Sequence, residues 1–325
     1  MKKILLSLSM IGAVAIVAVG ATGAFFSDTE TSTGNTFTAG AIDLGIDNTS
    51  YYNGVFQNGE NGTETTTWAL DWDIDNTEYP GNNPATTEVE NGYSLPTPRQ
   101  FFNFGDLKPG DYGEDTISAH VTNNDSWLCA DVKLTKDDDN TCVEPEEDSE
   151  GAGICNNASP AANADGDLAD QINFLWWADD GDNVLESDET PLLAGPLGAL
   201  AVGQTAHVRL ADSTGNIWGG SGPLSGSDTR YIGKAWCFGN IAPAPLSQSS
   251  VTANNRATST PAENGDGVIS PLVPGQPTDG GYTCTGASVI DNKAQTDQVT
   301  LDIGFRAEQS RHNAGFLCST PVISL

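Results

Sequence analysis

Acidic side chains crowd residues 179–189, directly after the apolar and aromatic run 174–177. Several carboxylates with a glycine at the bend, here Gly181, suit Ca²⁺, which binds many oxygen ligands from a flexible loop. The spacing departs from that of an EF-hand loop, so a solvated acidic turn is the alternative. The sequence predicts a candidate Ca²⁺ site, to which Asp165 and Asp167 could add ligands. Its predicted ligands are Asp179, Asp180, Asp182, Glu186 and Asp188.

Histidines are the residues that a secreted metallopeptidase would need, and His120, His207 and His312 lie far apart in the sequence. The sequence has no HExxH motif, which would place two imidazoles and a general base on one helix face. It also has no GxSxG nucleophile motif and no phosphate-binding P-loop. We therefore expect a protein that is not an enzyme and requires no cofactor, with a metallopeptidase as the enzymatic alternative.

Cysteine and tryptophan offer two further kinds of site. An even number of cysteines in an exported chain favours disulfides, and the absence of CxxC disfavours a zinc site. Cys142 and Cys155 bracket an acidic, glycine-rich loop, which predicts a local bridge between them. A sugar could stack on Trp68, Trp72, Trp176 and Trp177, although paired tryptophans more often divide between core and surface. The disulfide candidates are Cys129, Cys142, Cys155, Cys237, Cys284 and Cys318.

The charge of the whole chain limits its partners. Among 325 residues, 44 are acidic and 13 are basic, which gives a net charge of -31 and a pI near 4.1. Such a chain repels phosphates and anionic membranes, so we expect no nucleic-acid partner. The same charge opposes close approach of identical subunits at low salt, so self-assembly needs apolar burial, main-chain bonding or bound cations.

The first 24 residues have the pattern of a secretory signal peptide. Lys2 and Lys3 precede an apolar run over 4–20, and small residues follow through Ala24. We predict cleavage between Ala24 and Phe25, which leaves a protein secreted to the extracellular matrix or the cell surface, with no membrane contact. The alternative is an uncleaved membrane anchor, since the apolar run is nearly long enough to span a bilayer.

Alternation of apolar and polar residues predicts the elements that would position these groups. It is clear in 41–47, 116–122 and 298–307, and Pro109 and Gly110 mark a tight turn between strands. Helical periodicity is absent beyond residue 24. Many short strands separated by turns predict an all-β protein, a jelly-roll-like β-sandwich with long acidic loop insertions. We expect the domain to span 37–325, with insertions at about 48–98, 136–170 and 242–281.

Three stretches together resemble the TasA/camelysin family of secreted matrix-fibre and bundling-pilus subunits. They are TGAFFSDTETSTGNTFTAGAIDLGI (22–46), LKPGD (107–111) and FRAEQSRHNAGFLC (305–318). The first is similar to the family's signal exit and mature start, and the last to the C-terminal strand of cysteine-containing members. The resemblance implies a jelly-roll subunit that polymerises outside the cell by donor-strand complementation. The chain differs from compact members in its length, cysteines and acidic insertions.

Segment 25–36 is the predicted donor strand. An open sheet edge is a template for an added strand, and two buried phenylalanines would contribute about 3 to 6 kcal/mol. We expect copies of this chain as partners, together with other matrix components. For the segment, the alternatives are a frayed terminus or an ordinary first strand of its own subunit. For the protein, the alternative is a monomeric Ca²⁺-binding surface or adhesion protein. The predicted donor residues are Phe25, Phe26, Thr29, Thr31 and Thr33.

Overall fold

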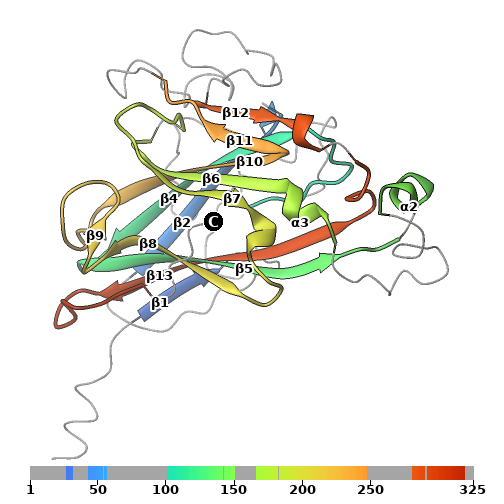
Figure 1. The fold of residues 1–325 in the computed structure, drawn as a ribbon. Coiled ribbons are helices and arrows are strands. Elements are labelled where there is room, and N and C mark those ends of the chain that lie inside the picture. Colours follow the sequence, from blue (N-terminus) through green and yellow to red (C-terminus); the bar gives the residue numbers. More distant parts are fainter. Residues whose placement is uncertain are drawn as a thin grey trace, which may run out of the picture.

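The computed structural model describes residues 27–31, 43–53, 55–56, 101–141, 143–150, 166–181, 183–246, 280–289 and 291–318. Antiparallel strands dominate this part of the chain (Figure 1). The described helical elements are short: α2 (Glu144–Glu150), α3 (Leu168–Gln171) and the 3-10 turns η2 (Leu197–Ala199) and η4 (Gly286–Ser288). The predicted all-β class is therefore confirmed. The predicted signal peptide and its cleavage site at Ala24 and Phe25 lie outside the described residues.

Two sheets pack face to face and form a β-sandwich (Figure 1). The five-stranded sheet has the order β1 (Ser27–Thr31), β13 (Gln298–Gln309), β5 (Ser126–Asp138), β8 (Thr205–Asp212) and β9 (Gly215–Asn216). The six-stranded sheet has the order β3 (Val55–Phe56), β2 (Asp43–Tyr52), β4 (Tyr112–Thr122), β10 (Thr229–Phe238), β6 (Ile172–Asp179) and β7 (Pro191–Pro196). The jelly-roll arrangement stays a prediction.

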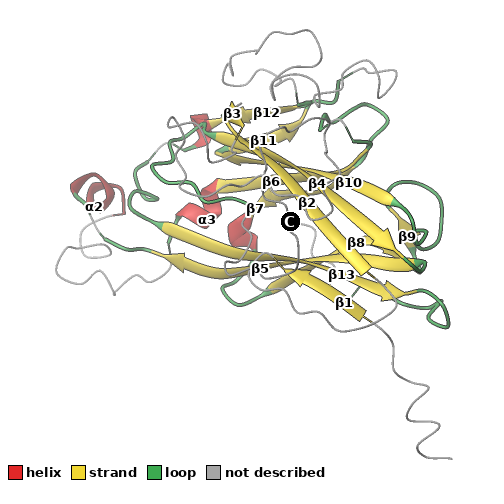
Figure 2. Ribbon diagram, turned by 180° about the vertical axis from the view of Figure 1, so that it is seen from behind, coloured by secondary structure: helices red, strands yellow, loops and turns green. Residues whose placement is uncertain are grey.

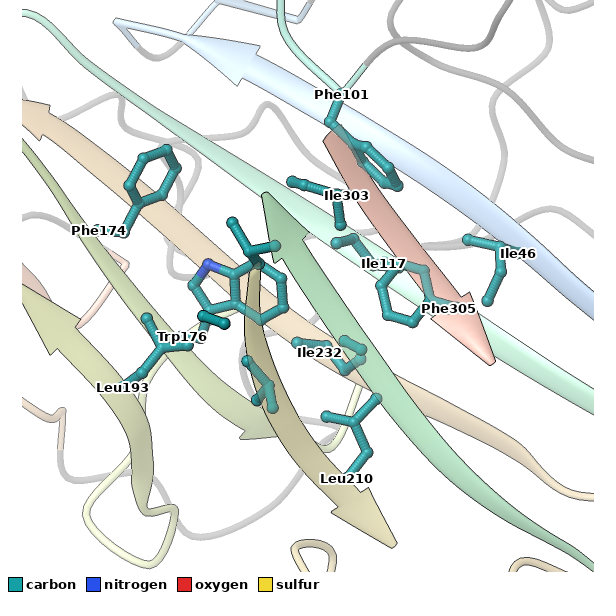
Figure 3. Close-up of a cluster of buried hydrophobic side chains, with 14 of the residues drawn as sticks. Ile46, Phe101, Ile117, Phe174, Trp176, Leu193, Leu210, Ile232, Ile303 and Phe305 are labelled. Carbon is teal, nitrogen blue, oxygen red and sulfur yellow. The ribbon is translucent and has the colours of Figure 1, made fainter. Parts of the chain in front are cut away.

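The main core lies between the two sheets, where alternate residues of each strand point inward (Figure 3). Ile303 and Phe305 of β13 face Ile117 of β4 and Ile232 of β10 across this interior. A second, smaller core lies on the other face of the six-stranded sheet, under the two-stranded antiparallel sheet of β11 (Asn240–Pro243) and β12 (Tyr282–Thr285). The six-stranded sheet is thus covered on both faces, which explains its many buried side chains.

The predicted turn before β4 is present. Gly110 has a φ of 96°, and the amide of Asp111 donates a hydrogen bond to the carbonyl oxygen of Lys108 at 2.8 Å. Proline followed by a residue with positive φ is what a type II turn requires, and glycine adopts that φ at little cost. The turn ends where Tyr112 begins β4, so it sets the start of the strand at the centre of the molecule.

The predicted insertions differ from the structure at their edges. The first was expected to start at residue 48, but β2 continues to Tyr52, because its backbone keeps pairing with β4 as far as Gly113. The second was expected over 136–170, yet β5 runs to Asp138 and α2 and α3 follow. The third was expected over 242–281, but β11 continues to Pro243, and β12 begins at Tyr282, directly after the predicted end. The remainder of these insertions lies largely outside the described residues.

Candidate functional site

The strand β1 lies at the edge of the five-stranded sheet, where β13 is its one partner among the described strands (Figure 2). The antiparallel pairing runs from Ser27 opposite Glu308 to Thr31 opposite Gly304. The next strand, β2, begins at Asp43 in the other sheet, so residues 32–42 connect the two sheets. A short edge strand on such a connection can be replaced by an equivalent strand from another copy, because the ladder on β13 is the same in both cases.

Of the predicted donor residues, Thr29 and Thr31 belong to β1, whereas Phe25, Phe26 and Thr33 lie outside the described residues. In the single chain β1 completes the sheet of its own subunit. Donation of this strand concerns a second copy of the chain and stays a prediction.

The acidic loop after β6 is organised by two carboxylates that bind its own backbone. Asp179 accepts hydrogen bonds from the amides of Gly181 (3.0 Å) and Asn183 (3.2 Å), and from the indole of Trp177 (3.1 Å). Glu189 accepts from the amides of Asp180 at 2.8 Å and Glu186 at 3.1 Å. These bonds fold residues 179–189 into a closed turn and bring carboxylates from both of its ends together.

Three carboxylates of this loop converge: oxygen atoms of Asp180, Glu186 and Glu189 lie within 4.8 Å of one another. Only 4% of Glu186 is exposed, and its Oε1 is buried and has no hydrogen-bond partner. Burial, together with neighbouring acids, raises the pKa of Glu186 to about 7 and that of Glu189 to about 9. A cation would satisfy the buried oxygen and offset the repulsion, and oxygen donors of this kind suit Ca²⁺ or Mg²⁺.

The structure brings together two of the predicted ligands, Asp180 and Glu186. The third member of the cluster is Glu189, which was not among the predicted ligands. Asp179 lies beside them but its carboxylate oxygens already accept three N–H groups, which gives it a structural role. Asp188 is exposed and lies outside the converging trio, and Asp182 lies outside the described residues. The sequence around Glu189 does not predict that it joins this cluster. Glu189 lies ten residues after Asp179, and the two ends of the loop become neighbours only when the closed turn forms.

A second carboxylate cluster joins three distant segments. Asp139 follows β5, Glu146 lies in α2, and Asp297 precedes β13, with oxygens within 4.8 Å of one another. Burial raises the pKa of Asp297 to about 7, and its Oδ2 accepts hydrogen bonds from the amides of Asp167 (2.7 Å) and Leu168 (3.1 Å). Asp167 was predicted to assist the loop after β6. Its backbone instead binds Asp297 at this second cluster, and Asp165 lies outside the described residues.

The three histidines belong to different environments. His120 on β4 contacts the hydroxyls of Ser118 and Thr229, each at 3.1 Å, and the Nδ1 of His207 on β8 lies 2.6 Å from Asp131. His312 is exposed in the turn that follows β13. Neither carboxylate cluster found among the described residues includes a histidine. A cavity of about 960 Å³ beside segment 101–109 is lined by apolar, amide, hydroxyl and acidic side chains and by Lys108, with no histidine or cysteine.

The four described cysteines form two disulfides. Cys129 on β5 is joined to Cys318 in the C-terminal tail, and Cys237 on β10 is joined to Cys284 on β12. The predicted bridge between Cys142 and Cys155 falls on residues outside the described part.

The described tryptophan pair offers no exposed face to a sugar. Trp176 points into the main core and Trp177 into the smaller one, and both are buried. Both faces of β6 are covered, so the expected division between core and surface fails here. Trp68 and Trp72 lie outside the described residues.

Comparison with known proteins returned no match to any family model and no match among curated sequences. In the described part of the chain, no helix is long and apolar enough to cross a membrane.

Proposed function

We propose that this chain is a secreted structural subunit that assembles with copies of itself into an extracellular fibre, each subunit donating its N-terminal segment to the next. The observation that carries the proposal is the position of β1, a five-residue edge strand that, in the part of the chain that the structure describes, pairs with β13 and no other strand. The resemblance of 22–46, 107–111 and 305–318 to the TasA/camelysin family supports it. Disulfides in the described part are compatible with an oxidising, extracellular location.

Exchange of β1 between copies requires no new kind of contact. Each copy offers the same edge of β13, so a strand from a neighbour recovers the same ladder of hydrogen bonds that the subunit's own strand makes. Each ladder bond contributes only about 1 kcal/mol net, so a five-residue pairing is weak enough to open and exchange.

A cysteine pair tests the exchange directly. Ser27 and Glu308 are opposite one another across β1 and β13, so Ser27→Cys with Glu308→Cys places two thiols at paired positions. Oxidised fibres of this variant should run as a ladder of covalent multimers on a non-reducing gel. Covalent monomers within intact fibres would show that β1 stays in its own subunit. Ser27→Cys alone is the control, and it should give no species larger than a dimer.

A second candidate function, binding of Ca²⁺ at the loop after β6, is favoured by the buried, unsatisfied Oε1 of Glu186. Titration calorimetry with CaCl₂ should give one binding event that Glu186→Gln and Glu189→Gln each abolish. Asp188→Asn is the matched control, since Asp188 is exposed and outside the trio, and it should leave that event intact. Loss of the event on Asp297→Asn instead would assign the cation to the second cluster.

A further inference from the structure

A lysine and an aspartate are enclosed together inside the main core. Lys234 on β10 and Asp115 on β4 are direct cross-strand partners, and the Nζ of Lys234 lies 2.5 Å from Oδ2 of Asp115. Their side chains are 0% and 1% exposed. The register of two central strands therefore holds an amine against a carboxyl group out of reach of bulk water.

Aromatic rings surround the amine. The Nζ of Lys234 lies 4.6 Å from the ring centre of Phe102, 5.4 Å from that of Phe101 and 5.9 Å from that of Phe174. On the carboxyl side, Asn48 and Ser50 of β2 are buried beside Asp115, and Ser50 is its cross-strand partner. The two reactive groups thus lie in an apolar chamber with a small polar wall, fixed in orientation by backbone pairing.

Such an environment favours the neutral forms of both groups. Burial lowers the pKa of Lys234 and raises that of Asp115, and the attraction between the two charges opposes both changes. Transfer of one proton from the ammonium to the carboxylate removes two charges from a dry interior, where an ion pair keeps a large desolvation cost. It leaves a free amine, which is a nucleophile, next to a protonated carboxyl, which is an electrophile.

We infer that Lys234 and Asp115 condense into an intramolecular isopeptide bond that joins β10 to β4. The lone pair of Nζ attacks Cγ of Asp115, the bond between Cγ and one carboxyl oxygen breaks, and that oxygen leaves as water with two protons from the pair. The products are one amide and one water molecule, and no oxidant, reductant or activated co-reactant is required. Proximity and fixed orientation in the core replace the activation that amide formation otherwise needs.

This bond would lie within one subunit and does not depend on the proposed assembly. It would link the two central strands of the six-stranded sheet at their midpoint, which neither described disulfide does. The link would keep the sheet connected under extraction or force when hydrogen bonds alone would separate.

Peptide mapping of the purified full-length secreted protein tests the inference. After denaturation, reduction and alkylation, trypsin should fail to cleave after Lys234, because an acylated lysine is not a substrate. The peptides that carry Asp115 and Lys234 should appear as one branched species, lighter than their sum by one water molecule. Cleavage after the exposed Lys133 in the same digest shows that digestion is complete.

Two linear peptides with cleavage after Lys234 in the wild-type protein would overturn the inference and leave a buried ion pair. Lys234→Arg is the matched control, because it keeps the positive charge but should not form this amide. It should give linear peptides only, and its melting temperature should fall relative to the wild type. The wild-type map decides the question even if this variant does not fold.

Discussion

Several acidic side chains of this protein are buried or partly buried in the folded structure. Glu186 and Glu189 in the loop after β6, and Asp297 before β13, all have raised pKa values, with burial as the first cause and neighbouring acids as a further one. A carboxyl group with a raised pKa in the folded state binds protons more tightly when folded than when unfolded. Folding is therefore coupled to pH and to any cation that replaces the proton.

The sign of this coupling gives the first prediction. The pKa of Glu186 rises from 4.5 to about 7 and that of Glu189 to about 9, so in chelator the free energy of unfolding should decrease as pH rises through this range. Added CaCl₂ should stabilise the protein more at pH 8 than at pH 5, because protons compete for the same oxygens. Urea unfolding at both pH values, with and without Ca²⁺, measures this.

Glu189→Gln serves as the comparison for that measurement. It removes the carboxyl with the highest pKa of the trio, so the decrease of stability at alkaline pH should become shallower and the Ca²⁺ effect should shrink. An equal Ca²⁺ effect at both pH values in the wild type would show that this loop does not bind the ion.

Gly233 on β10 gives the second prediction at this scale, because the ring of Trp177 occupies the space where its side chain would be. A Cβ at Gly233 would lie 1.9 Å from a ring atom of Trp177, which is itself fully buried. Gly233→Ala should destabilise the protein by about 1 to 3 kcal/mol or more through overpacking. Gly105→Ala, where nothing lies within 4 Å, is the control and should change stability little.

Individual strands differ in how clearly their local sequences predict them. In β13, apolar residues at every second position predict a strand with one face in the core, and Ile303, Phe305 and Ala307 are buried as expected. In β2 the inward positions after Ile46 carry Asn48 and Ser50, which resemble loop residues. They are inward because they face the buried Asp115, a partner almost seventy residues away in the sequence. No local pattern contains that information.

The C-terminal tail, residues 310–318, is the element for the third prediction. It lies across β5 and β8, held by the Cys129–Cys318 disulfide and by hydrogen bonds that include one from the amide of Cys318 to Asp212 at 3.2 Å. Cys129→Ala with Cys318→Ala opens a loop with a sequence separation of 189, for which chain entropy gives a loss of about 5 kcal/mol. Urea unfolding should show that loss.

Amide exchange should identify where the loss arises. Residues near Phe316, whose carbonyl accepts the amide of Ser213 at 2.9 Å, should exchange faster in the double variant. The control is Cys237→Ala with Cys284→Ala, which should loosen β12 instead of the tail. Unchanged exchange in the tail would mean that its hydrogen bonds hold it without the disulfide.

At the scale of the whole molecule, sequence patterns predict the class of fold and fail for groups that meet only through topology. Turn residues and period-two alternation are local, so they predicted strands and the turn at Pro109. The second carboxylate cluster and the pair Lys234 and Asp115 depend on which strands become neighbours. The closed turn after β6 is intermediate: its acids were evident, but the choice of Glu189 over Asp188 depends on backbone hydrogen bonds.

The net charge of -31 makes assembly sensitive to salt, which gives the fourth prediction. Cleavage at the predicted signal-peptide site would also remove Lys2 and Lys3 and make the subunit more negative still. Repulsion between exposed charges is screened within about 10 Å at 0.1 M salt and about 3 Å at 1 M salt. If donated strands hold subunits together, raising the NaCl concentration should speed fibre formation, because screening lowers the barrier to approach and leaves main-chain pairing intact.

Light scattering and electron microscopy across a NaCl series measure this, with a variant that lacks residues 25–33 as the matched control. That variant keeps nearly all of the charge and the rest of the sandwich but loses β1. It should form no fibres at any salt concentration, which separates strand donation from salting-out of the folded domain.

CaCl₂ at matched ionic strength should speed fibre formation more than NaCl does if the carboxylate clusters bind the ion. Fibres that dissolve as NaCl rises would instead mean that attraction between charged groups holds the subunits, and donor-strand assembly would then be the wrong mechanism.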